Sequence, residues 1–229
     1  MIFKHFIAVS ILLNILFAKF PDAVGYNGMV VSSNKYASDI GIEILKKGGN
    51  AIDAAVGVSF ALAVVHPGAG NIGGGGFMVI RTADGKVTTI DFREKAPSAA
   101  FKDMFLDDSL NVIPNKSWST ALASGVPGTV YGLGLAHEKY GTMTWETLIY
   151  PSINLAKFGF KLDYHNLMLL NSEKYKSLLS NDIESKKIFT NQKGFKLNDI
   201  FIQKNLSKTL MRIAKYGYKE FYNGKTADY

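Results

Sequence analysis

Helical spacing of apolar residues predicts two consecutive helices near the start of the chain. In the first, small or apolar side chains recur at helical intervals, at Ala37, Ile40, Gly41, Ile44 and Leu45. Gly48 and Gly49 follow this pattern and predict the end of the helix. Asn50 can then cap a second helix, with Asp53 at the capping-box position. Residues 51–65 are apolar on nearly every side, which is typical of a helix buried between two layers.

Three short apolar runs have the length and composition of strands. Residues 28–33 form the first run and precede the first helix. The other two, residues 77–82 and 87–92, are separated by a turn that contains Asp-Gly. An Asp-Gly turn between two β-prone runs strongly favours a hairpin. A looser polar stretch follows the hairpin, over residues 93–119.

The second half of the chain is mostly helical in pattern. Pro127 stands near the first turn of a predicted helix that runs to about Tyr140. Thr144 can cap the next helix, Pro151 interrupts it, and a further helix ends near Gly159.

From Asp163 onward the chain is helical and rich in lysine. Asn205 can cap a last helix over residues 206–216, closed by Gly217. The order of strand, two helices, hairpin and many helices predicts an α+β fold, with an antiparallel sheet covered by helices.

The first residues have the composition of a secretory signal peptide. After a short basic start, residues 6–17 are almost entirely apolar, and Ala18 offers a small residue for cleavage. The run is too short to cross a bilayer. We therefore expect a signal peptide over residues 1–18, or 1–24 at the longest, and an exported bacterial protein that is periplasmic or secreted, with no membrane attachment after cleavage. Leu16 stands where a small residue is usual, which leaves a retained anchor as the alternative.

Composition excludes several kinds of site. The chain has no cysteine, which excludes disulfides, thiolate metal sites and a thiol nucleophile. Its four histidines lack metal-ligand spacing, so we expect no metal and no cofactor, and we interpret His66, before a proline, as a local hydrogen-bonding residue. The net charge of +7 comes from residues 157–229, but 23 of the 26 basic residues are lysine. Nucleic-acid readers favour arginine, so we interpret this region as a solvated surface and expect no nucleic-acid partner.

Two apparent nucleotide motifs fail on their context. Gly68, Gly70 and Gly73 fit G-x-G-x-x-G, but a helix precedes them and a strand follows, the reverse of a dinucleotide site. These glycines are better explained by tight bends and close approach of another segment. Residues 223–226 resemble the end of a phosphate-binding loop, but Lys219 stands where its first glycine is required.

Arg93 is the candidate binding residue. It stands at the end of the second hairpin strand and is one of only three arginines. Its planar guanidinium suits bidentate binding of a carboxylate. The alternative is a surface ion pair with Glu94 or Asp91, worth less than ~1 kcal/mol. The residue chemistry alone leaves both interpretations open.

Several motifs in register resemble the gamma-glutamyltransferase (glutathione hydrolase) family. They cover nearly all of the chain after the signal segment and occur in the family's order, at residues 48–55 (GGNAIDAA), 71–78 (NIGGGGFM), 91–97 (DFREKAP), 124–129 (SGVPGT), 207–217 and 221–224. One departure is residues 203–205, Gln-Lys-Asn, where the family usually has Gln-Pro-Asp.

The resemblance implies an N-terminal-nucleophile hydrolase with an αββα sandwich. Such a precursor cuts itself into a large and a small subunit, and the new N-terminal threonine attacks the γ-glutamyl amide of glutathione or related compounds. Water, or an acceptor amino acid or peptide, then takes the glutamyl group. The family's matching arginine binds the α-carboxylate of that group, which assigns this role to Arg93.

The resemblance also places the chain within the precursor. Residues 25–229 match the N-terminal part of the large subunit, and none of the eleven threonines lies in the family's self-cleavage motif. We therefore expect an incomplete sandwich, a catalytic threonine outside this chain, and no turnover by the chain alone. Two alternatives remain: an acylase or capsule-processing transpeptidase of the same fold, against which residues 91–94 argue, and a non-catalytic relic or partner-binding product.

Overall fold

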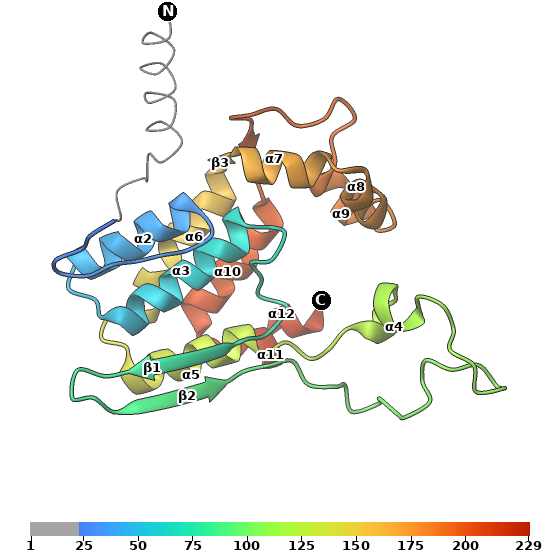
Figure 1. Ribbon diagram of the computed structural model, residues 1–229, viewed down its shortest axis with the longest axis horizontal. Coiled ribbons are helices and arrows are strands. Elements are labelled where there is room, and N and C mark those ends of the chain that lie inside the picture. Colours follow the sequence, from blue (N-terminus) through green and yellow to red (C-terminus); the bar gives the residue numbers. More distant parts are fainter. Residues whose placement is uncertain (1–22) are drawn as a thin grey trace, which may run out of the picture.

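A central buried helix organises the fold. The computed structural model describes residues 23–229, so the predicted signal peptide over residues 1–18 lies outside the described part. Helix α3 (Ala51–Val65) packs between α2 (Lys35–Lys46) and α6 (Trp145–Phe158), and α10 (Lys204–Tyr216) packs on α6 (Figure 1). Helix α3 is almost wholly buried, as its apolar sequence predicts.

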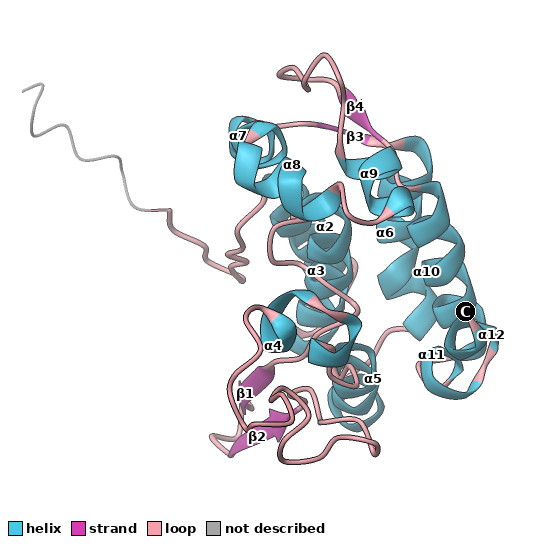
Figure 2. Cartoon of the chain, turned by 90° about the vertical axis from the view of Figure 1, so that its right-hand side faces the viewer, coloured by secondary structure: helices cyan, strands magenta, loops and turns pink. Residues whose placement is uncertain are grey.

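The remaining elements lie at the two ends of this core. Figure 2 shows the short helices α7, α8 and α9 at the end opposite the β1–β2 hairpin. In the part of the chain that the structure describes, the smaller elements are α4 (Lys116–Ser119), η1 (Ala121–Ala123), α5 (Thr129–Tyr140), β3 (Phe160–Lys161), α7 (Tyr164–Asn171), α8 (Glu173–Leu179), α9 (Ile183–Phe189), β4 (Ile200–Phe201), α11 (Glu220–Asn223) and α12 (Lys225–Asp228). Among residues 23–229, no helix combines the length and apolar character needed to cross a bilayer.

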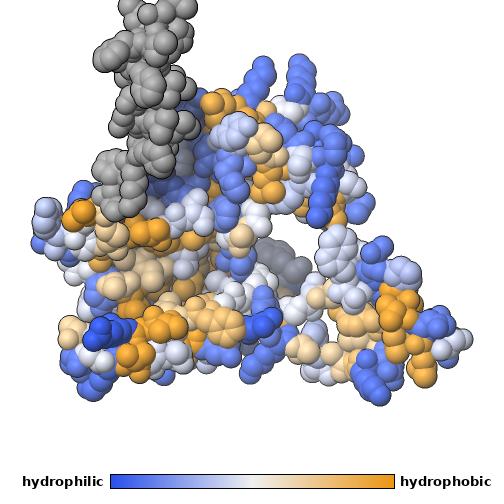
Figure 3. Space-filling view, in the orientation of Figure 1, coloured by the Kyte–Doolittle hydropathy of each residue, from blue (hydrophilic) through white to orange (hydrophobic). Residues whose placement is uncertain are grey.

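The predicted hairpin is confirmed to within a residue. Strands β1 (Phe77–Arg81) and β2 (Val87–Asp91) pair antiparallel, and Asp-Gly lies in the turn between them. Ile80 and Ile90 point inward and pack against α5. On the outer face Phe77, Val79 and Val87 are 65%, 73% and 65% exposed, and apolar residues gather there in Figure 3. The hairpin is therefore covered by described residues on one face only.

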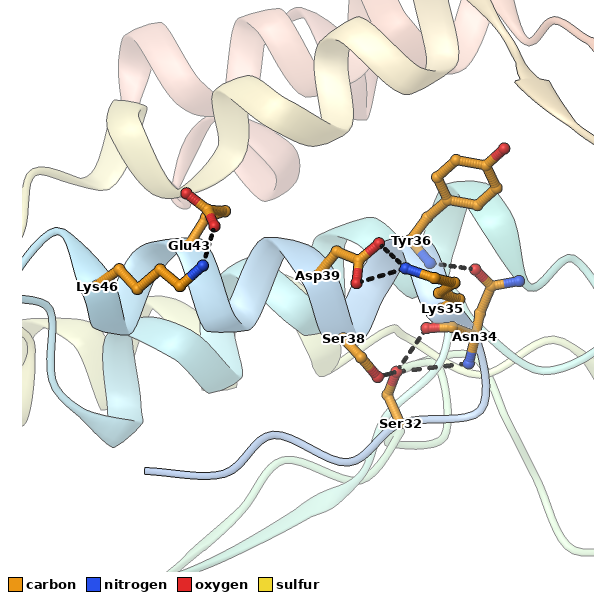
Figure 4. Close-up of polar contacts among 8 residues, drawn as sticks. All are labelled: Ser32, Asn34, Lys35, Tyr36, Ser38, Asp39, Glu43 and Lys46. Carbon is orange, nitrogen blue, oxygen red and sulfur yellow. Dashed lines mark hydrogen bonds and ion pairs between the residues drawn. The ribbon is translucent and has the colours of Figure 1, made fainter. Parts of the chain in front are cut away.

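Helix α2 begins with an Asn cap and packs closely on α3. The side chain of Asn34 accepts the Tyr36 N–H at 2.9 Å, while the Ser32 and Ser38 hydroxyls lie 2.8 Å apart (Figure 4). Gly48, at φ +90°, follows the helix, as expected. A Cβ at Gly41 would lie 2.7 Å from both Val30 and Val58, so glycine is required for this helix contact.

Side chains hold both ends of α3, from neighbouring residues at its start and from distant ones at its end. At its start the predicted capping box of Asn50 and Asp53 is present. At its end Gln203 donates to the Val64 carbonyl at 2.7 Å. The next carbonyl, of Val65, accepts N–H groups from the side chains of Asn34 and Asn166 at 3.3 and 2.9 Å. These contacts satisfy carbonyls that a helix end leaves without partners.

Three local predictions are wrong. Residues 28–33 form no strand, because no other described segment pairs with them. Pro151 does not divide its helix: α6 is continuous, since packing against α3 and α10 offsets the lost backbone hydrogen bond. Asn205 does not cap α10, which begins at Lys204 with Gln203 at the N-cap position. The two-residue pairing of β3 with β4 was not predicted. The fold is otherwise a mixture of helices and antiparallel strands, as expected.

Candidate substrate site around Arg93

Arg93 lies just beyond β2, with its guanidinium exposed. Its backbone N–H donates to Asp91 Oδ1 at 3.0 Å, which fixes the turn of the chain. The guanidinium carbon lies 6.0 Å from the centre of the Phe77 ring. Within residues 23–229 it forms no ion pair, so the surface pair with Glu94 or Asp91 is not present. Its side-chain donors therefore remain open to an anionic ligand.

The glycine loop that precedes β1 binds the start of α5. The Gly74 carbonyl accepts the N–H groups of Gly128 and Thr129 at 2.7 and 3.0 Å. Asn71 supports the same junction, because its Oδ1 accepts the Gly74 N–H at 2.8 Å and the Thr129 hydroxyl at 3.0 Å. Two segments more than fifty residues apart in sequence are thereby fixed together.

The segment that carries Arg93 joins this junction on both sides. Gly76 and Phe92 exchange backbone hydrogen bonds at 3.3 and 3.0 Å, and Lys95 and Val126 exchange theirs at 3.1 and 2.8 Å. A Cβ at Gly128 would lie 1.9 Å from the Phe92 carbonyl oxygen, so only glycine fits there. Close approach explains Gly70 as predicted, since a Cβ there would lie 1.9 Å from the Leu62 carbonyl oxygen, whereas a Cβ at Gly73 would meet no atom within 4 Å.

A cavity of about 310 Å³ opens beside these segments. Its lining includes Arg93, Lys95, Pro127, Tyr131 and Tyr222. This volume is at the lower end of the range for small-molecule pockets. Two cationic side chains and aromatic walls suit a small ligand that carries a carboxylate. Sequence reasoning identified Arg93 but missed Tyr131 and Tyr222. The family motif at residues 221–224 includes Tyr222, but sequence reasoning assigned this motif no function.

Arg212, the apparent phosphate-loop motif and His66 do not line this cavity. Arg212, in α10, pairs with the buried Glu220 at 3.4 Å and has a structural role. Residues 223–226 join α11 to α12 and form no phosphate loop. His66 forms local hydrogen bonds through its backbone, as interpreted: its N–H donates to the Leu62 carbonyl, and its carbonyl accepts the N–H groups of Ala69 and Gly70. Its ring Nδ1 is buried without a partner among the described residues. Burial and the neighbouring His165 lower the pKa of His66 below its ordinary value.

The comparisons with known proteins match the residues around this cavity and the core behind them. The family model for gamma-glutamyltranspeptidase matches residues 37–229. The chain belongs to the gamma-glutamyltranspeptidase family. It is 50% identical over 203 residues to the glutathione hydrolase proenzyme of Pseudomonas sp. (strain A14), and 48% identical over 205 residues to that of Escherichia coli (strain K12). Each alignment covers 88% of this chain and 35% of the relative.

A solved gamma-glutamyltranspeptidase shares the fold. The crystal structure of the Helicobacter pylori enzyme matches with a TM-score of 0.86 at 46% identity, and covers 91% of this chain and 60% of that one. The described core thus has the arrangement found in the N-terminal-nucleophile hydrolase fold of this enzyme family. The chain spans about a third of the length of the curated relatives it matches.

Proposed function

We propose that a full-length protein carrying this chain is a glutathione hydrolase. It cleaves the γ-glutamyl amide of glutathione and related compounds, and transfers the glutamyl group to water or to an acceptor amino acid or peptide. The observation that carries the proposal is the open guanidinium of Arg93 in a cavity bounded by three family motifs. The identity of about half of the aligned residues to glutathione hydrolase proenzymes supports it.

In this proposal Arg93 binds the α-carboxylate of the γ-glutamyl group. A guanidinium can donate two parallel hydrogen bonds to one carboxylate. The carboxylate is remote from the amide bond that breaks, so its binding sets the position of the γ-carbonyl carbon against the nucleophile. Arg93 therefore acts in binding and orientation, whereas the covalent step belongs to an activated threonine.

We infer that residues 25–229 form the N-terminal part of the large subunit and that the rest of the precursor supplies the threonine. The exposed apolar residues Phe77, Val79 and Val87 support this view. A second sheet that packs on this face would complete an αββα sandwich and bury them. The small subunit from the same precursor is the expected partner. Export to the periplasm or the medium, after removal of residues 1–18 or 1–24, belongs to the same proposal.

The test is expression of a full-length precursor that carries this chain. We expect it to cleave itself into two subunits, and the small subunit to begin with threonine by N-terminal sequencing. The purified heterodimer should release the chromophore from a γ-glutamyl anilide. A correctly cleaved heterodimer that neither hydrolyses nor transfers the γ-glutamyl group would refute the proposal.

A further inference from the structure

A tyrosine hydroxyl stands inside the first turn of α5. Tyr222 Oη donates to the Pro127 carbonyl at 2.9 Å and accepts the Tyr131 N–H at 3.1 Å. Helix α5 has Gly128 at its N-cap position and no side-chain cap of its own. The hydroxyl comes from α11, 91 residues after Tyr131 in the sequence. It therefore caps a helix to which it is not a sequence neighbour.

This hydroxyl links two backbone groups at the start of α5. Pro127 and Tyr131 are four residues apart, the spacing at which a helix forms a direct backbone hydrogen bond. Here the hydroxyl joins the two groups instead. The hydroxyl thus keeps the Pro127 carbonyl apart from the Tyr131 N–H, so the two groups do not bond directly. Removal of the hydroxyl leaves two backbone groups either unpaired or free to close on each other.

Tyr222 is itself well fixed. Its ring makes edge contacts with Tyr131 and Phe221, at centroid distances of 6.0 and 5.1 Å. Burial raises the pKa of Tyr222 above its ordinary value, and this effect exceeds the opposite effect of the Tyr131 N–H. The hydroxyl is therefore protonated at neutral pH and can donate to Pro127.

The segment held by Tyr222 lines the cavity together with Arg93. Residues 126–128 line the cavity, and Val126 is paired through backbone hydrogen bonds with Lys95, two residues beyond Arg93. We propose that Tyr222 is a positioning residue that holds the Pro127 end of this segment beside Arg93, and so influences the affinity for the γ-glutamyl group. The proposal rests on the proposed function, because it takes the ligand to be a γ-glutamyl compound.

The test is Tyr222→Phe in the full-length, self-cleaved protein, with Tyr36→Phe as the matched control. The Tyr36 hydroxyl also accepts one backbone N–H, from Lys161 at 3.3 Å, but it does not line the Arg93 cavity. We expect Tyr222→Phe to raise KM for a γ-glutamyl anilide about 5-fold, the affinity change for loss of one neutral hydrogen bond. Its kcat should change less than KM, and Tyr36→Phe should leave both values unchanged.

A double-mutant cycle with Arg93→Lys shows whether Tyr222 acts through Arg93. We expect the double variant to raise KM by less than the product of the two single effects, because both changes loosen one binding geometry. Equal KM values for Tyr222→Phe and Tyr36→Phe, or fully additive effects in the cycle, would overturn the positioning role. Neither result would affect the proposed function, which fails only if the wild-type heterodimer does not act on γ-glutamyl compounds.

A second variant covers the case in which Tyr222→Phe does not fold. Replacement of Tyr222 by 3,5-difluorotyrosine keeps the hydroxyl but lowers its pKa. Once ionised, the oxygen still accepts the Tyr131 N–H but no longer donates to Pro127. We expect KM of this variant to rise, relative to that of wild type, as the pH passes the new phenol pKa. A ratio of the two KM values that does not change with pH would contradict the proposal.

Discussion

The buried carboxylate of Asp53, at the start of α3, is bound by Thr142, which lies 89 residues later in the chain. The Thr142 hydroxyl donates to Oδ2 at 2.6 Å, and its backbone N–H donates to Oδ1 at 3.0 Å. The N–H groups of Asn50 and Met143 donate to the same carboxylate at 2.9 and 3.3 Å. Burial raises the pKa of Asp53, but these hydrogen bonds more than compensate, so the pKa lies below its ordinary value. A negative charge is thus kept in the interior by dipoles alone.

We expect Thr142→Val to lower the free energy of unfolding by about 2 kcal/mol, because it removes a hydrogen bond to a buried charge. The control is Thr89→Val, on the exposed face of the hairpin, which should stay within about 0.5 kcal/mol of wild type. Urea unfolding of the purified proteins measures both. Equal midpoints for the two variants would show that the carboxylate does not need this hydroxyl.

Acid should destabilise the protein through His66. Burial and His165 lower the pKa of His66 below 6.5, and the opposite effect of Asp163 is smaller. The unfolded chain therefore takes up this proton more readily than the folded one. Stability is fully present above the unfolded pKa and falls as the pH drops below it. We expect Tm to decrease from about pH 7.5 to about pH 5.5, and to decrease less in His66→Asn. Parallel curves for the two proteins would assign the acid sensitivity to other groups.

Arg93 should matter for catalysis far more than Arg81. Charge-assisted hydrogen bonds contribute about 1.5–3 kcal/mol, so Arg93→Lys and Arg93→Ala should lower kcat/KM for a γ-glutamyl anilide at least ~10-fold. Arg81 lies at the far end of β1 and does not line the cavity, so Arg81→Ala is the control. Each variant must first show normal self-cleavage. Small and equal effects of all three changes would return Arg93 to the role of a surface residue.

The 229-residue chain on its own should bind a dye that reports apolar surface and should show no γ-glutamyl turnover. The first expectation follows from the exposed Phe77, Val79 and Val87 on the outer hairpin face. The variant Val79→Thr/Val87→Thr should bind less dye, because it makes this face polar. Weak dye binding by the wild-type chain, or the same binding by the variant, would contradict the first expectation. Turnover above a heat-killed control would contradict the second.

Local chemistry explains which elements the sequence predicted. The capping box of Asn50 and Asp53 and the Asp-Gly turn of the hairpin each act within a few residues, and both are present. The fate of Pro151 depends on neighbours that only the folded chain brings together, so its local preference was misleading. The β3–β4 pairing joins two residues on each side and has no periodicity that a sequence pattern can show.

The candidate site divides in the same way. Arg93 could be identified from sequence because arginine is rare in this lysine-rich chain and this one lies in a recognisable family motif. The rest of the cavity depends on contacts such as Tyr222 with Pro127, which lie 95 residues apart. No spacing rule connects such residues, and a tyrosine in a short helix is usually a packing residue.

The long-range hydrogen bonds at the two ends of α3 have a consequence for folding during synthesis. Gln203 reaches the Val64 carbonyl from 139 residues further along, and Thr142 reaches Asp53 from 89. During synthesis, the most apolar helix of the described chain is made before either of these partners. Until Gln203 and α10 have been synthesised, the C-terminal carbonyls of α3 lack this partner and its apolar surface is incompletely buried. In that state α3 is a natural target for a chaperone that holds unfolded chains. Stable folding of α3 therefore depends on the synthesis of later residues, and rapid formation of the first helices alone is not sufficient.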